Sequence, residues 1–459
     1  MHENWSRVRA ATLAFVEGAP DAPNGALITM LHSLAPQRRI DDIEAWLREI
    51  PAGRVALGVS IGVRGELLLS VVAGDEGGSF MHTSASPDAV GWQVHEALRD
   101  LLAPDALDHT PLRGSDAPRA GALARLCALL DGPLGGCFAD LPHGRPQMLA
   151  VFAPGALRAL PWWALTAGGI VLRDRFASVT HLPCLGFGRG AAEGDEPRVF
   201  CAFGEVQDVG ETRFGACALA SLRAHFPGTL VAEPQDTSRG STIVESELLS
   251  EVSAAVEVVR WYGVGTPHTV NPSTEGLTLS HGRTLVPRNL LGTTLPRCRR
   301  VEYWAATGDA GALIATTTGD RDVFPQLVWS ALAAGAGGVL DLAWPVHDLV
   351  KALVCERFGI NVRRYEVPDP VALGLALREV SALLTRWKRE APRFDSTWAA
   401  LAWLDEGRRV HAREMGLDAG EVAPFAAYAD APCVGVDVPA LVSSCTSPMQ
   451  LGAFRWWGS

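Results

Sequence analysis

Short apolar runs alternate with amphipathic segments through the second half of this chain, and this order constrains the fold more than any other feature. Runs of this length are typical of buried strands, and the longer segments between them favour helices. Strands that alternate with helices favour parallel pairing, so the pattern predicts an α/β fold with a mainly parallel sheet flanked by helices. The predicted strands are Arg198–Phe203, Val258–Tyr262, Arg300–Trp304 and Gly338–Ala343, and the predicted helices are Ser246–Val256, Gln326–Ala334 and Asp348–Arg357.

The first half has a different pattern. Two β runs, Val55–Ile61 and Glu66–Ala73, flank a short turn and predict a hairpin. Residues 3–50, 88–103 and 118–131 are predicted to be helical. A compact apolar run at Gln147–Ala153 ends in Pro154-Gly155, which predicts a buried strand followed by a turn.

Charge and cysteine usage exclude several classes of function. With 40 Lys and Arg against 51 Asp and Glu, the net charge of −11 disfavours nucleic acid as a partner and fits a basic peptide or a protein better. The nine cysteines include no C-x-x-C pair, so we expect reduced thiols and no metal site. Gly263-Val264-Gly265 lacks the third glycine of a nucleotide-binding loop, and no cofactor is predicted.

Targeting signals are also missing from the sequence. The first residues lack a basic stretch followed by an apolar run, and no run reaches the roughly 18–20 apolar residues that a membrane span needs. We therefore expect a cytoplasmic protein that does not enter a membrane.

Four segments carry recognisable motifs, in this order: Phe152–Leu165, His181–Leu185, Ala333–Asp348 and Trp398–Leu401. They are similar to P-D-G-x-L-x-x-L-P-[FW]-x-A-L, L-P-S-L, A-G-A-x-x-V-x-x-x-L-W-x-V-x-D and W-A-A-F, respectively. In these motifs and their order the chain resembles the CHAT family of caspase-like cysteine peptidases. The resemblance covers about residues 50–407.

The resemblance implies a caspase-like or separase-like sandwich, in which a degenerate N-terminal half supports a C-terminal half that bears the active cleft. The implied divisions are a helical segment at 1–50, the N-terminal half with its hairpin at 51–195, the CHAT half at 196–407 and an extension at 408–459.

The two segments that match the catalytic motifs of the family keep the surrounding motif residues but lack the catalytic His and Cys. Active CHAT members carry His in H-F-A-G-H-G and Cys in L-S-A-C-x-T-G, because an imidazole must activate the thiol. The matching segments here read Arg260-Trp261-Tyr262-Gly263-Val264-Gly265 and Glu302-Tyr303-Trp304-Ala305-Ala306-Thr307-Gly308. Val264 therefore stands at the His position and Ala305 at the Cys position, and neither side chain can do the chemistry.

A displaced pair does not replace the lost dyad. His268 follows Val264 by four residues, but Cys298 precedes the strand that ends at Trp304. Seven steps at about 3.3 Å each separate Cys298 from Ala305 by about 23 Å, which places this thiol at the wrong end of the sheet.

Three residues are candidates for binding a substrate or peptide in the vacated cleft: Asp348, Asp309 and Trp344. Asp348 matches the acid of W-x-V-x-D, which in the family lies near the pocket for the residue before the scissile bond, and would attract Lys or Arg. It would serve equally as the N-cap of the helix that follows. Asp309 either lines the cleft or belongs to the Thr307-Gly308 turn.

The chain ends in Phe454-Arg455-Trp456-Trp457-Gly458-Ser459. The Trp pair is either docked on the body of the protein or presented to a partner.

These features predict an inactive CHAT pseudopeptidase that binds or regulates a protein or peptide in a bacterial defence or regulated-proteolysis system. Its partner would be an active peptidase or effector encoded nearby. The alternative is an active CHAT cysteine endopeptidase in which Ala305 replaces the native Cys.

Overall fold

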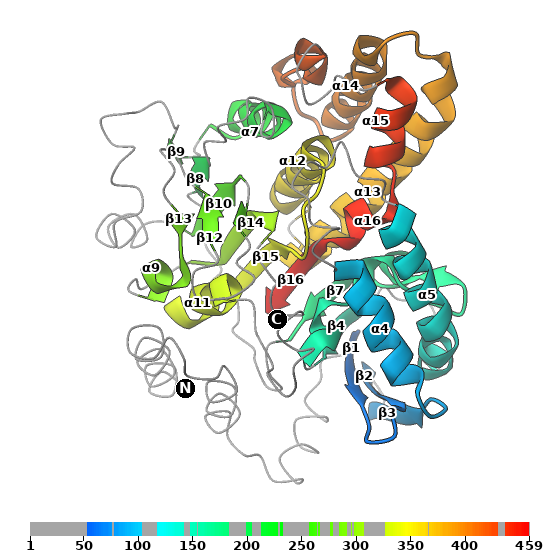
Figure 1. The fold of residues 1–459 in the computed structure, drawn as a ribbon. Coiled ribbons are helices and arrows are strands. Elements are labelled where there is room, and N and C mark those ends of the chain that lie inside the picture. The colour runs from blue at the N-terminus through cyan, green and yellow to red at the C-terminus, as the bar shows by residue number, and fades with distance from the viewer. Residues whose placement is uncertain are drawn as a thin grey trace.

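The computed structural model is built around one large sheet, seen in Figure 1 with helices on both of its faces. The residues that it describes are 53–75, 78–102, 117–141, 147–153, 155–182, 199–203, 213–227, 230–232, 257–263, 265–266, 276–278, 284–291, 295, 298–306, 326–365, 367–429 and 437–458. The predicted helices at 3–50 and 246–256 lie outside these ranges.

The sheet has eleven strands in the order β3-β2-β1-β4-β7-β16-β15-β14-β10-β8-β9. The fold class is therefore the predicted α/β class, with a mainly parallel sheet flanked by helices. The strands are β1 (Arg54–Ile61), β2 (Leu67–Asp75), β3 (Gly78–Ala85), β4 (Met148–Phe152), β7 (Ser178–His181), β8 (Val199–Phe203), β9 (Leu230–Ala232), β10 (Val258–Tyr262), β14 (Arg300–Ala306), β15 (Gly338–Leu342) and β16 (Phe454–Gly458).

Two parallel groups of strands run in opposite directions. β1, β4, β7 and β16 are parallel to one another, and so are β15, β14, β10, β8 and β9. The groups meet where β16 pairs antiparallel with β15. Consequently the carboxyl ends of β10, β14 and β15 lie at one edge of the sheet, and those of β1, β4 and β7 lie at the opposite edge.

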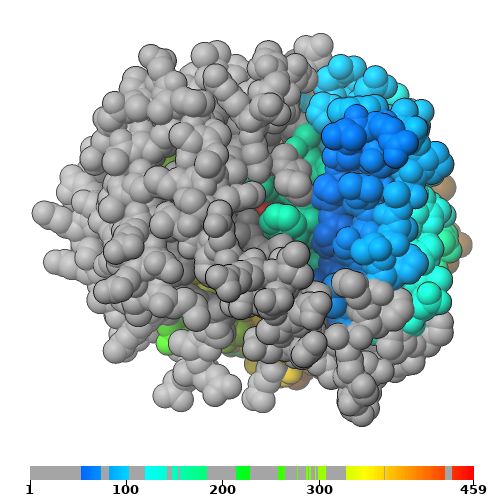
Figure 2. Space-filling view, turned by 90° about the horizontal axis from the view of Figure 1, so that it is seen from below, coloured from blue at the N-terminus to red at the C-terminus, as the bar shows by residue number. Residues whose placement is uncertain are grey.

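The N-terminal strands form the outer part of the sheet. β1, β2 and β3 are joined by antiparallel pairing, so the predicted hairpin is a three-stranded unit. α4 (Val90–Leu102) and α5 (Ala117–Phe138) cover one face of it (Figure 1). Seen from below, the hairpin and α4 form the blue side of the surface in Figure 2. α5 extends past the predicted 118–131 because its Pro133 is accommodated inside the helix.

The C-terminal strands are covered on both faces. α7 (Arg213–His225) and α12 (Asp348–Arg364) lie on one side, and α9 (Pro287–Leu291) and α11 (Gln326–Ala334) lie on the other (Figure 1). The remaining elements are α6 (Leu172–Arg175), α13 (Asp369–Glu390), α14 (Thr397–Glu414), α15 (Val438–Cys445), α16 (Pro448–Gly452), the β5–β6 ribbon (Thr166–Ala167, Ile170–Val171), the small sheet β11 (Gly265–Thr266), β12 (Gly276–Thr278) and β13 (Thr284–Leu285), and 3-10 turns at Gly155–Ala159, Trp162–Ala164, Ala391–Arg393, Ala419–Glu421 and Phe425–Tyr428.

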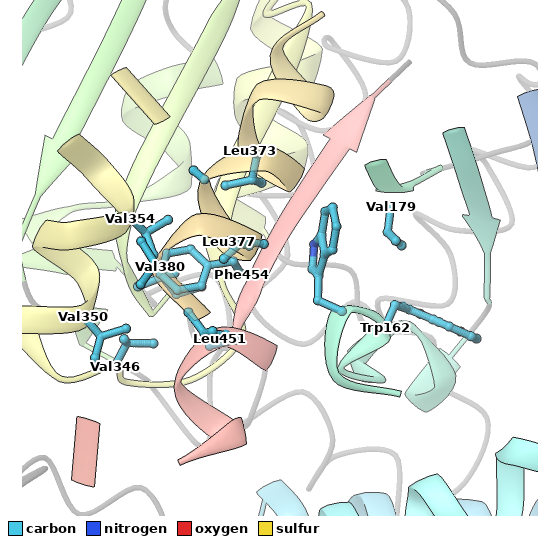
Figure 3. Packing of buried hydrophobic residues seen from close by; sticks show 14 of the residues in the cluster. Trp162, Val179, Val346, Val350, Val354, Leu373, Leu377, Val380, Leu451 and Phe454 are labelled. Carbon is cyan, nitrogen blue, oxygen red and sulfur yellow. The ribbon is translucent and has the colours of Figure 1, made fainter. Parts of the chain in front are cut away.

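The C-terminal strand, β16, lies where the two parallel groups of strands meet. All five residues of β16 are buried, and Trp456 and Trp457 are only 2% and 0% exposed. The Trp pair is therefore docked on the body of the protein, and the alternative that it is presented to a partner is wrong. Figure 3 shows Trp162 and Val179 on one side of β16 and Val350 and Leu377 on the other, so the core is continuous across it.

The predicted division of the chain at residues 50, 195 and 407 stays a prediction. α14 continues across residue 407, and β16 brings the end of the extension into the sheet.

Candidate functional site

The candidate site lies at the carboxyl ends of β10 and β14. These strands pair in parallel with Tyr262 opposite Trp304, as predicted. The residues that follow each strand therefore leave the same edge of the sheet. β14 continues through Ala306, past its predicted end at Trp304, so Ala305 lies in the strand and not in the loop that would follow Trp304. Val264 lies outside the described residues.

Aromatic side chains fill both faces of the sheet beside Ala305. Trp304 packs against Phe358 and Phe454, with ring centroids 6.2 Å and 6.1 Å away. On the opposite face, Trp261 stacks on Tyr303 with their centroids 5.4 Å apart. Ala305 itself is only 3% exposed. A methyl group thus occupies the position that the CHAT resemblance gives to the nucleophile, and it is closed to solvent.

Asp348 is a buried acid with several internal partners. Its Oδ2 accepts from the amides of Phe214 at 2.9 Å and Gly215 at 3.3 Å, which belong to the first turn of α7. Its Oδ1 accepts from the hydroxyl of Tyr262 at 2.7 Å. Burial raises the pKa of Asp348, and Lys351, Tyr262 and the two amides offset this in part. Asp348 therefore caps α7 and fastens it to the end of β10.

The prediction that Asp348 caps its own helix is wrong. His347 is the N-cap of α12, and its Nδ1 accepts from the amide of Leu349 at 3.2 Å. Burial and the nearby Lys351 lower the pKa of His347 to about 4, so the imidazole is neutral at pH 7. Asp348 is one residue too late for this cap and is directed at the neighbouring helix instead.

Lys351 occupies the space between Asp348 and the end of β10. Its ammonium lies 3.7 Å from Asp348 Oδ1, donates to the carbonyl of Gly263 at 3.1 Å and stands 4.4 Å from the centroid of the Tyr262 ring. A basic side chain from a partner would have to displace this internal lysine to reach Asp348. Sequence reasoning missed Lys351, although the Asp348–Lys351 spacing of three on a predicted helix was a usable signal.

Two of the described thiols, Cys298 and Cys217, have no features of a nucleophile. Cys298 lies before β14, at the end of the strand remote from Ala305, as predicted, and donates to the carbonyl of Arg300. Burial raises the pKa of Cys298 to about 12 and that of Cys217 to about 11. Attack on a carbonyl needs the thiolate, which these environments disfavour.

Trp344 lies in the segment between β15 and α12, buried against the C-terminal part of the chain. Its Nε1 donates to the carbonyl of Met449 at 3.0 Å. Asp309 and His268 lie outside the described residues. The predicted roles of Asp309 and Trp344 in binding a peptide stay predictions.

Charged side chains form a buried network beside Trp304. Glu302 accepts from Arg260, Arg300 and the Nε1 of Trp304. Burial opposes ionisation of Glu302, but the two guanidinium groups outweigh it and lower its pKa to about 2. Arg300 also contacts Asp369 at 3.3 Å, which ties β14 to α13. This network fixes the orientation of Trp304.

No group of three His, Cys, Asp or Glu suited to a metal ion occurs among the described residues. None of the described helices combines the length and apolarity needed to cross a bilayer.

Comparison with solved structures finds similar chains, and two of them are structures of the separase–securin complex of Saccharomyces cerevisiae. They are 10% and 11% identical to this chain, each with a TM-score of 0.47. The match covers 80% of this chain but 32% of the separase chain, so this chain spans about a third of that length. The likeness concerns the fold alone. No family model and no curated protein sequence matches this chain.

Proposed function

We propose that this chain is a caspase-like pseudopeptidase of the CHAT type, which acts by binding a protein or peptide in a bacterial defence or regulated-proteolysis system. The observation that carries the proposal is Ala305. It lies at the carboxyl end of β14, beside β10, where the CHAT resemblance requires the nucleophilic cysteine.

The surroundings of Ala305 support the loss of chemistry. Bulky aromatic side chains pack on both faces of β10 and β14, and Ala305 is closed to solvent. Next to Gly263, which precedes the family's His position, the structure has the ammonium of Lys351, and this group is engaged by Asp348 and a backbone carbonyl. A protonated amine held in this way does not serve as a general base.

The interior of the site also argues for a partner that is bound rather than cleaved. Asp348 has three hydrogen-bond donors and an adjacent cation, so recognition of a basic residue by this carboxylate would require rearrangement. Selection of a partner then falls to the surface of the protein. We propose an active peptidase or effector encoded nearby as that partner.

The test uses purified wild-type protein together with each protein encoded next to it. We expect isothermal titration calorimetry to show that one of them binds. The mass of that partner should be unchanged after incubation with this protein. The same preparation should not hydrolyse a peptide library. Ala305→Cys tests the active alternative: if the native residue is Cys and another side chain than Val264 supplies the base, this variant should hydrolyse peptides. Cleavage of the bound partner by the wild-type chain would overturn the proposal.

A further inference from the structure

The short helix α16 contacts the segment 343–347, which links β15 to α12 and carries the W-x-V-x-D motif except for its final Asp. Two hydrogen bonds join the segment to α16, and a third joins it to Ala453, the C-cap residue of the helix. The amide of Ala343 donates to the carbonyl of Ala453 at 2.8 Å, the indole of Trp344 donates to Met449, and the amide of His347 donates to Gln450 Oε1 at 2.8 Å. Gln450 is 6% exposed, so its amide side chain is committed to the interior.

The other side of α16 contacts the N-terminal half. A Cβ atom placed on Gly452 would lie 3.1 Å from the Cβ of Ala164, 3.3 Å from that of Pro161 and 3.6 Å from the Trp344 ring. These distances leave no room for movement of α16 toward its neighbours. α16 is therefore wedged between the Pro161–Leu165 turn of one half and the 343–347 segment of the other.

The contacts of β16 hold α16 in place. Arg455 forms a two-pronged contact with Asp341 of β15, and the Nε1 of Trp457 donates to the same carboxylate at 2.8 Å. All three side chains are buried. The strand directly after α16 is thus fixed in the centre of the sheet, so α16 has a defined position against which the 343–347 segment can rest.

We infer that Gln450 is a positioning residue, and that α16 sets the geometry of the 343–347 segment and through it the N-cap of α12. His347 receives its backbone orientation from Gln450 and passes it on, because its Nδ1 caps Leu349 and its carbonyl accepts from the amides of Val350 and Lys351. Lys351 in turn reaches Gly263. The part of the chain beyond the CHAT resemblance therefore controls the candidate site. The positioning role of Gln450 does not depend on the proposed function, but the functional importance of the candidate site does.

The test is hydrogen exchange of the full-length protein, followed by mass spectrometry of peptides from 343–351. Gln450→Met keeps the length of the side chain and removes the acceptor. We expect exchange of the His347 amide to rise on the order of tenfold, as the loss of about one hydrogen bond implies. Peptides from β1 and β4 should be unchanged.

A matched pair of variants separates positioning from general destabilisation. Trp344→Phe and Trp387→Phe each remove an indole that donates to a backbone carbonyl at 3.0 Å, the first to α16 and the second to α14. Trp344→Phe should raise exchange in 343–351, and Trp387→Phe should leave that segment as in wild type.

Unchanged exchange of 343–351 in folded Gln450→Met would overturn the inference. So would an equal rise in both Trp variants. No partner enters this experiment, so its failure is distinct from failure of the proposed function.

Discussion

The N-terminal and C-terminal strands of the sheet are buried in different ways. In β1 and β4, buried residues such as Val55, Leu57 and Val151 alternate with partly exposed ones. In β10, β15 and β16 every residue is buried. The N-terminal strands therefore need cover on one face, whereas the C-terminal strands must satisfy every side chain inside the protein.

The difference extends to charge. The fully buried side chains of β1 and β4 are apolar, and the C-terminal strands bury Arg260, Glu302, Asp341 and Arg455 in ion pairs. Removing one partner of such a pair leaves an uncompensated charge in the interior. The C-terminal strands should thus be sensitive to loss of a single polar group, and the N-terminal strands to loss of apolar volume.

Removal of β16 should have the largest effect. Deleting Phe454 and all that follows takes away a central strand with three buried aromatic side chains, each worth about 3–5 kcal/mol. Total stabilities are about 5–15 kcal/mol, so we expect the folded state to be lost. Urea unfolding followed by circular dichroism tests this. A chain that ends at Gly458 is the control, and equal midpoints for the two would contradict a joining role for β16.

Glu302→Gln should have the next largest effect. The change keeps the shape of the side chain but leaves Arg260 without its ion-pair partner, at a cost of about 3–5 kcal/mol. Glu406→Gln is the control, because Glu406 is exposed on α14 and its pairs with Arg409 and Arg413 are worth at most about 1 kcal/mol. Similar shifts in the urea midpoint for both variants would show that buried ion pairs are not what distinguishes the C-terminal strands.

Asp348→Ala should cost about 2–3 kcal/mol. It removes the cap of α7 and the hydrogen bond to Tyr262, both buried. Asp437→Ala removes the exposed cap of α15 and should cost about 1 kcal/mol. If Asp348→Ala is no more destabilising than Asp437→Ala, then Asp348 does not hold α7 to β10.

Acid should expose the smallest difference per pH unit, through His347. Because its folded pKa is lowered to about 4, the unfolded chain binds a proton between about pH 6.5 and 4 that the folded chain does not. The stability that the neutral imidazole provides is present above pH 6.5 and falls with pH down to about 4. His347→Asn, which keeps an N-cap acceptor, should reduce the slope of unfolding free energy by up to about 1.4 kcal/mol per pH unit. An unchanged slope would contradict a buried neutral His347.

Strand and helix positions were predictable where the apolar pattern is local. Val258–Tyr262 and Gln326–Ala334 match β10 and α11 to the residue. The position of β16 was not predictable, because its pairing with β7 joins Trp457 to His181 across most of the chain. The third hairpin strand, β3, was also missed, since its sequence lacks an alternating pattern.

The strand pairing at the candidate site was predictable from the sequence, but the side-chain contacts were not. Parallel pairing of β10 and β14 placed Tyr262 beside Trp304. The partners of Asp348 include the amide of Phe214, 134 residues away, and no local pattern indicates a contact over such a separation. Only the structure therefore shows that Asp348 caps α7.

Labelling of the native protein by a peptide-based, thiol-directed electrophile tests the central claim most directly. The sites of modification would be mapped by mass spectrometry after digestion. With Ala305 at the position that the CHAT resemblance gives to the nucleophile, and Cys298 buried with a pKa raised to about 12, we expect none of the cysteines with described side chains to be labelled faster than in the unfolded chain. Rapid, stoichiometric labelling of one cysteine in the native protein, accompanied by peptide hydrolysis that the label abolishes, would contradict the claim that this chain is a pseudopeptidase.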